Sequence, residues 1–180
     1  MRDARSVIRD ATESDVPSIL AIYNDILATS TAIFSEIPAT LEERLQWLRT
    51  RQAQGYSVLV ATEDSGVVGF ASFTDFRSWP GYRYTVEHSV HVRADARGRG
   101  IGGALMRVLL ERATLAGKHV MVAGVDADNV GSIRLHERLG FRRSGTLHHV
   151  GCKFGRWLDL AFLERRLDER PAPPAGPPAR

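Results

Sequence analysis

The sequence predicts an α/β fold in which a mixed β-sheet is flanked by helices. Strand-like and helix-like patterns follow one another in the order β-α-α-β-β-β-α-β-α-β-β. With 180 residues, of which 43% are hydrophobic and 25% charged, the chain has the size and composition of one globular domain with a sizeable core. A strand, a glycine-rich loop and a helix occur in succession near its middle, as is common in α/β proteins.

The first half of the chain contains a strand, two helices and three further strands. Thr12 and Ser14 are helix-capping residues that precede an apolar face with helical spacing, and Thr40 with Glu43 forms a second capping box. Alternating or continuous β-branched and apolar runs between turns predict the strands. We expect strands at 6–11, 57–62, 67–76 and 83–92, helices at 12–27 and 41–54, and a loop at 77–82.

The second half is expected to add two helices, a buried strand and a hairpin. The glycines at 117 and 140 end the two helices, and the apolar run "HVMVAGVD" indicates a strand that is buried on both faces. We expect helices at 103–116 and 129–141, a strand at 119–126, and a hairpin of 145–154 with 156–164. One domain would then span 1–168, and the proline-rich tail at 169–180 would be disordered.

Composition excludes several classes of function. The net charge of +3 is spread along the chain, whereas a nucleic-acid-binding protein more often shows a basic stripe with aromatic residues. Cys152 is the only cysteine, so neither an intrachain disulfide nor a multi-cysteine zinc site is expected, and no His/carboxylate set has metal-site spacing. Because the chain has no long apolar run and no apolar leader, we expect a cytoplasmic protein without membrane or metal.

The segment "RADARGRGIGGALM" at 93–106 has the character of an anion-binding loop. Glycines allow backbone N–H groups at a helix N-terminus to approach an anion, and arginines add charge-assisted hydrogen bonds. A dinucleotide-binding turn is one interpretation, supported by the G-x-G-x-x-G spacing and by Asp126 at the end of the next strand. The five residues between strand and first glycine, and the short remaining chain, argue against it. An ordinary surface turn is the other alternative.

The loop resembles the acetyl-CoA loop of the Gcn5-related N-acetyltransferases, the GNAT family. The stretches "AIYNDIL", "TVEHSVHV", "SIRLHERLGF" and "VGCKFGRWLDLAF" extend the resemblance to the phosphinothricin and methionine sulfoximine N-acetyltransferases. It covers about residues 8–167 and implies the acyl-CoA N-acyltransferase fold. It also implies that acetyl-CoA would be bound by Val90, His91, Val92, Arg97, Gly98, Arg99, Gly100, Ile101, Gly102, Gly103 and Asn129.

Two residues are candidates for proton transfer. Glu87 lies in an otherwise apolar strand, where desolvation would raise the pKa of its carboxyl group, and the resembling enzymes place their base here. A solvated strand glutamate is the structural alternative. His136 stands where many relatives carry a tyrosine that protonates the leaving thiolate, although a helix histidine is as often a packing residue. Strand alternation places His88 on the face opposite Glu87, which favours a structural role.

The amine substrate is expected to contact the loop at 77–82 and neighbouring strand residues. Arg77 suits an α-carboxylate through a bidentate fork, while Trp79, Tyr82 and Phe34 are candidate pocket walls. The full set of candidate substrate contacts is Phe34, Arg77, Ser78, Trp79, Tyr82, Glu87, His88 and Ser89.

The resemblance therefore implies an acetyl-CoA-dependent N-acetyltransferase that acts on a small amino acid analogue. Methionine sulfoximine, methionine sulfone and phosphinothricin are not distinguished by these residues. A non-catalytic acyl-CoA-binding module and a protein or peptide N-acetyltransferase are the alternatives, and Glu87 together with Arg77 disfavours both. The final hairpin resembles one that pairs subunits in relatives, so a homodimer is expected.

Overall fold

The computed structural model describes residues 6–175 and contains one mixed, seven-stranded sheet. The strands lie in the order β1-β2-β3-β4-β5-β7-β6. All neighbouring strands are antiparallel except β4 and β5, which are parallel. The strands are β1 (Val7–Asp10), β2 (Val58–Glu63), β3 (Gly66–Asp75), β4 (Thr85–Val92), β5 (Val120–Asp126), β6 (Arg142–Lys153) and β7 (Arg156–Arg166).

Four α-helices flank this sheet, in the element order predicted from the sequence. They are α1 (Val16–Thr29), α2 (Leu41–Ala53), α3 (Ile101–Leu115) and α4 (Val130–Arg138). The capping box of α2 is present: the hydroxyl of Thr40 accepts from the backbone N–H of Glu43 at 3.2 Å, and the Glu43 carboxylate accepts from the N–H of Thr40 at 2.7 Å. A short 3-10 helix at Glu13–Asp15 precedes α1, so α1 starts later than its capping pattern predicts.

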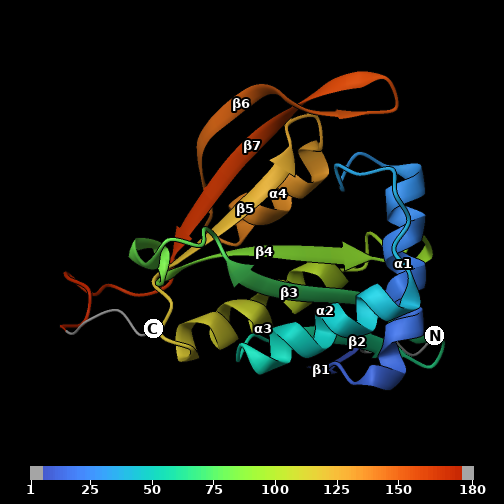
Figure 1. Ribbon diagram of the computed structural model, residues 1–180, viewed down its shortest axis with the longest axis horizontal. Coiled ribbons are helices and arrows are strands. Elements are labelled where there is room, and N and C mark those ends of the chain that lie inside the picture. The colour runs from blue at the N-terminus through green and yellow to red at the C-terminus, as the bar shows by residue number, and fades with distance from the viewer. Residues whose placement is uncertain (1–5, 176–180) are drawn as a thin grey trace.

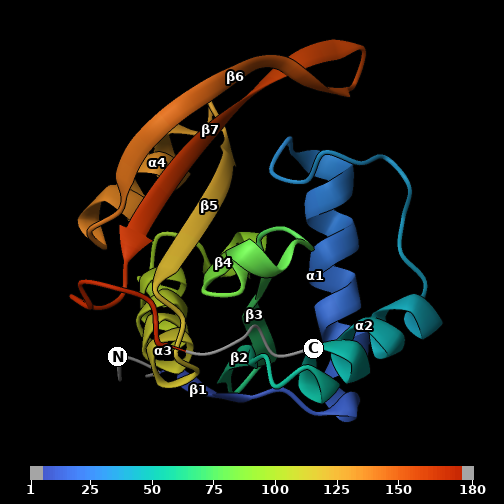
Figure 2. The same ribbon diagram turned by 60° about the vertical axis from the view of Figure 1, so that its left-hand side comes forward.

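Two hydrophobic clusters cover opposite faces of the sheet. One joins α3 to β2, β3, β4 and β5 and includes the fully buried Leu105, Met106 and Leu109. The other joins α1 and α2 to β2 and β3 around Ile19 and Phe70. Figure 2 shows α1 and α2 on one side of β2 and β3, and α3 on the other. The sheet is therefore a central layer between two layers of helices.

The β6–β7 hairpin extends away from the rest of the sheet. In both views it leans from β5 toward the loop that follows α1 (Figures 1 and 2). The tail begins after this hairpin: residues 171–175 form neither helix nor strand and are exposed, and residues 171–174 line a small pocket with Tyr84 and His119. The remainder of the predicted disordered tail, 176–180, lies outside the described residues. Within 6–175, no helix is long and apolar enough to cross a membrane.

Candidate active site

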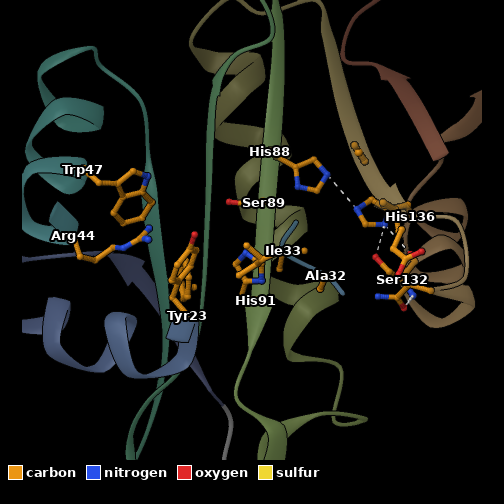
Figure 3. Close-up of a pocket in the computed structure, with 17 residues that line it drawn as sticks. Tyr23, Ala32, Ile33, Arg44, Trp47, His88, Ser89, His91, Ser132 and His136 are labelled. Atoms are coloured by element: carbon orange, nitrogen blue, oxygen red, sulfur yellow. Dashed lines mark hydrogen bonds between the residues drawn. The ribbon is translucent and has the colours of Figure 1, made fainter. Parts of the chain in front are cut away.

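A cavity opens where β4 and β5 separate. The two strands are paired only from Thr85 to Glu87 on β4 and from Val120 to Val122 on β5. A cavity of about 470 Å³ lies where this pairing ends, and we term it the β4–β5 cavity. Side chains from α1, α2, β4 and α4 surround it (Figure 3). It is lined by Tyr23, Ala32, Ile33, Arg44, Trp47, Phe70, His88, Ser89, Val90, His91, Ala123, Gly124, Val125, Asp126, Asn129, Ser132 and His136.

A second cavity of about 650 Å³, the loop channel, continues from this opening to the glycine loop. Ala32, Val90, His91, Asn129 and Ser132 line both cavities, so the two are adjacent. Most of the residues expected to bind acetyl-CoA line the channel, namely Val90, His91, Val92, Arg97, Gly98, Gly100, Ile101, Gly102, Gly103 and Asn129. The expected cosubstrate residues are thus gathered along one continuous hollow.

The glycine loop leaves the start of α3 without a side-chain cap. Gly98 and Gly100 have φ of +74° and +81°, a left-handed conformation that strains other residues. Gly100 is the N-cap of α3 and supplies no side-chain hydrogen bond, so the first N–H groups of the helix have no capping acceptor. Those groups, with the positive end of the helix dipole, suit a phosphate. The residues present therefore fit the diphosphate of coenzyme A.

Arg97 and Arg99, the two arginines expected to bind acetyl-CoA, both contact other groups of the protein. Arg97 donates from Nε to the carbonyl oxygen of Val92 at 3.1 Å, and Arg99 forms an ion pair of 2.6 Å with Glu63. Arg97 lines the channel, whereas Arg99, expected with it, is not among the channel residues. The backbone N–H groups and Arg97 therefore remain for an anion in the channel, whereas Arg99 is neutralised by Glu63.

Glu87 is the last residue of β4 that pairs with β5, at the edge of the opening. It is half-buried, and this burial raises the pKa of its carboxyl group, while the positive charge of Arg77 opposes the rise less strongly. A Cβ atom at Gly124 would lie 3.0 Å from Oε1 of Glu87, so the glycine leaves room for the carboxylate. Since Gly124 lines the β4–β5 cavity, the carboxylate of Glu87 lies beside that cavity.

His88 and His136 form a buried pair across the strand gap. Their Nε2 atoms are 3.1 Å apart, and Nδ1 of His136 is 2.7 Å from the carbonyl oxygen of Ser132 (Figure 3). A carbonyl can only accept, so the hydrogen bonds assign the proton of His136 to Nδ1, and Nε2 accepts from His88. Burial lowers the pKa of both rings. The acid role of His136 stays a prediction, and these bonds do not favour it.

The loop expected to bind the substrate lies near Glu87 but outside both cavities. Arg77, Ser78 and Trp79 are exposed, Trp79 by 74%, and the guanidinium of Arg77 lies 4.3 Å from the ring centroid of Phe76. Tyr82 lines a separate groove together with Phe76. Ser89 faces the β4–β5 cavity, as expected of a substrate contact.

Lys153 holds the loop after α1 against the hairpin, a role that the sequence did not indicate. It is almost fully buried, and its Nζ donates to the carbonyl oxygens of Leu27, Ser30 and Ile33 at 2.6, 2.7 and 2.8 Å. The ring of Phe34 packs on Gly151, where a Cβ atom would lie only 2.3 Å away. Ala32 and Ile33, and not the expected Phe34, therefore line the β4–β5 cavity.

The comparisons with known proteins agree with this geometry. The model of the acetyltransferase (GNAT) family matches residues 19–141. A methionine sulfoximine and methionine sulfone acetyltransferase of Pseudomonas aeruginosa is 53% identical over 162 residues, covering 89% of this chain and 94% of the relative. A phosphinothricin N-acetyltransferase of Streptomyces coelicolor is 37% identical over 163 residues, covering 89% and 95%.

Solved structures show the same fold. An acetyltransferase from Salmonella typhimurium, solved with acetyl-CoA, superposes with a TM-score of 0.92 at 46% identity and covers 96% of this chain and 99% of that one. The chain belongs to the acetyltransferase (GNAT) family. It is an N-acetyltransferase with the acyl-CoA N-acyltransferase fold, as its motifs predicted.

Proposed function

We propose that this protein transfers the acetyl group of acetyl-CoA to the α-amino group of a small amino acid analogue of the methionine sulfone, methionine sulfoximine or phosphinothricin type. The observation that carries the proposal is the meeting of the loop channel with the β4–β5 cavity beside the carboxylate of Glu87. The names of the relatives from Pseudomonas aeruginosa and Streptomyces coelicolor support the substrate class.

The glycine loop would hold the diphosphate of acetyl-CoA, and the shared wall of Val90, His91 and Asn129 would receive the pantetheine arm. The backbone of β4 is free to bind this arm because β4 has no partner strand on this side beyond Glu87. A helix N-terminus at one end and an unpaired strand edge at the other would together position the thioester.

Glu87 would act as the general base. Its carboxylate accepts a proton from the substrate ammonium, directly or through one water, and the freed nitrogen forms a C–N bond at the thioester carbonyl as the C–S bond breaks. The raised pKa of Glu87 brings the base closer to neutral pH than an exposed carboxylate. Burial lowers the pKa of His136, which reduces its protonated form at neutral pH and makes it a weaker candidate for protonating the thiolate.

Arg77 would bind the α-carboxylate of the substrate. The positive charge of Arg77 lowers the pKa of Glu87, which supports a carboxylate site near the base. A free amino acid carries both groups on one carbon, whereas a lysine within a protein chain lacks the carboxylate. This pairing favours a free amino acid over the protein or peptide substrate of the alternative function.

We also propose that the single domain at 1–168 forms a homodimer in the cytoplasm through its C-terminal hairpin. Leu147, Val150, Phe154 and Trp157 of β6, β7 and their turn expose between 47% and 67% of their surface. Exposed apolar residues gathered on one hairpin are typical of an interface.

The experiment that tests the function is mass spectrometry after incubation with acetyl-CoA and a panel of amines. The panel contains methionine sulfone, methionine sulfoximine, phosphinothricin, unmodified amino acids and a peptide with a free N-terminus. We expect a gain of one acetyl group on the analogues. Acetylation of the peptide alone would support the protein N-acetyltransferase, and binding of acetyl-CoA with no product would support the non-catalytic module.

A further inference from the structure

Within the described part of the chain, the positive charge of Arg44 on α2 is not held in an ion pair, although it contributes slightly to lowering the pKa of the neighbouring Glu43. Among residues 6–175 it makes no ion pair and no side-chain hydrogen bond, and its Nε is buried without a partner. By contrast, Arg49 on the same helix forms a two-pronged ion pair with Glu13, at 2.6 and 2.9 Å. When a cationic side chain beside a cavity has no partner in the protein, it is available to bind a ligand.

The guanidinium of Arg44 is nevertheless held in place. Its Cζ lies 3.8 Å from the ring centroid of Tyr23 and 4.9 Å from that of Trp47, and all three side chains line the β4–β5 cavity. Figure 3 shows Arg44 directed from α2 toward Tyr23, on the far side of β4 from His88 and His136. Stacking on aromatic rings fixes the plane of a guanidinium and leaves its N–H edges free.

This guanidinium lies on the same side of the sheet as the base. Strand alternation places Glu87, Ser89 and His91 on one face of β4, and the ring of His91 makes an edge contact with Tyr23 at 6.4 Å. The positive charge of Arg44 also contributes, after burial, to lowering the pKa of His91 to about 4. The floor of the cavity thus runs from Ser89, two residues after Glu87, along β4 to His91 and Arg44.

We propose that Arg44 binds the oxygen-bearing group at the far end of the substrate side chain, with a phosphinate or carboxylate anion as its preferred ligand. The inference rests on the proposed function. Glu87 and His91 are about 13 Å apart along a strand, which accommodates a five- or six-carbon amino acid with a hydrogen bond of roughly 3 Å at each end. The amine then lies at Glu87, the α-carboxylate at Arg77 and the distal oxygens at Arg44.

The test is a set of substrates that differ only in the distal group, assayed with Arg44→Met. Phosphinothricin has an anionic group, methionine sulfone a neutral acceptor and norleucine none. We expect kcat/KM to fall about ten- to a hundredfold for phosphinothricin and two- to tenfold for the sulfone, because charge-assisted hydrogen bonds are the stronger. For norleucine it should not change.

Arg49→Met is the matched control, since Arg49 lies on the same helix and is bonded to Glu13. It should leave the order of the three substrates unchanged. An equal loss of kcat/KM for all three with Arg44→Met would overturn the inference and assign Arg44 to packing only. If the wild-type protein acetylates none of the three substrates, the proposed function is contradicted, whatever the effect of Arg44→Met.

Discussion

The two hollows that meet at the β4–β5 opening are built in different ways. The loop channel is formed mainly by the segment from Val90 through Gly103 and by α4 with its N-cap Asn129, and Ile26, Ser30 and Ala32 complete its wall. The β4–β5 cavity is formed by side chains from α1, α2, β3, β4, β5 and α4, which are far apart in the chain. The channel offers backbone N–H groups to a constant ligand, while the cavity offers side chains to a variable one.

This difference implies that mutations should separate the two binding steps. A change in the glycine loop acts on acetyl-CoA, a change in the side chains of the cavity acts on the amine, and a change in Glu87 acts on the reaction itself.

Glu87→Gln should lower kcat by about 10²- to 10⁴-fold, the usual contribution of a general base. Glutamine retains the size of the side chain but cannot accept the proton at neutral pH. Because Glu87 lies beyond the channel residues, the affinity for acetyl-CoA measured by calorimetry should hardly change. A mutant that keeps more than about a tenth of the wild-type kcat would show that Glu87 is not the base.

Arg77→Ala should raise the KM for the amino acid by about ten- to a hundredfold, since a charge-assisted bond to a carboxylate contributes roughly 1.5–3 kcal/mol. The KM for acetyl-CoA should stay within experimental error. Steady-state kinetics with each substrate varied in turn make the comparison. Equal increases for both substrates would indicate a folding defect and would remove Arg77 from the amine site.

Gly100→Val should weaken acetyl-CoA binding by about tenfold, because a β-branched residue in the left-handed region costs roughly 1–2 kcal/mol and shifts the N-terminal amides of α3. Gly55→Val is the matched control. Gly55 has a similar φ of +75° and equally open surroundings, but it follows α2 and lies outside the channel. If both variants lose the same affinity in calorimetry, backbone strain and not phosphate binding explains the result.

Thr31→Val should have the smallest effect, a two- to tenfold rise in the KM for the amine, as one hydrogen bond contributes about 0.5–1.5 kcal/mol. The hydroxyl of Thr31 donates to the carboxylate of Asp126 and so ties the loop after α1 to the cavity wall. Thr29→Val, which loses only a bond to Asp25 within α1, serves as the control. No difference between the two variants would show that this tie does not shape the cavity.

The same contrast explains how much could be predicted from the sequence. The order of strands and helices, the capping box at Thr40 and the glycine loop depend on residues that are close in the chain, and all three are present in the structure. The raised pKa of Glu87 followed from the apolar strand around it.

The remaining parts of the site depend on tertiary contacts. Lys153 donates to three carbonyl oxygens of residues more than a hundred positions away in the chain. Arg44 of α2 contacts the ring of Tyr23 only because α2 packs beside α1. The same holds for Phe34, which was expected in the pocket and packs on Gly151 instead. Such contacts cannot be predicted from a local pattern of residue types.

The dependence of kcat/KM on pH tests the central claim that the carboxylate beside the opening is the base. Burial raises the pKa of Glu87, so the carboxyl group is protonated and inactive below that pKa and becomes an active base as the pH rises through it. Wild-type kcat/KM should therefore rise with an apparent pKa between those of a free carboxylate and the substrate amine, and then level off. In Glu87→Gln this limb should vanish, leaving a slow rate that follows deprotonation of the amine alone. The same acidic limb in wild type and mutant would contradict the account.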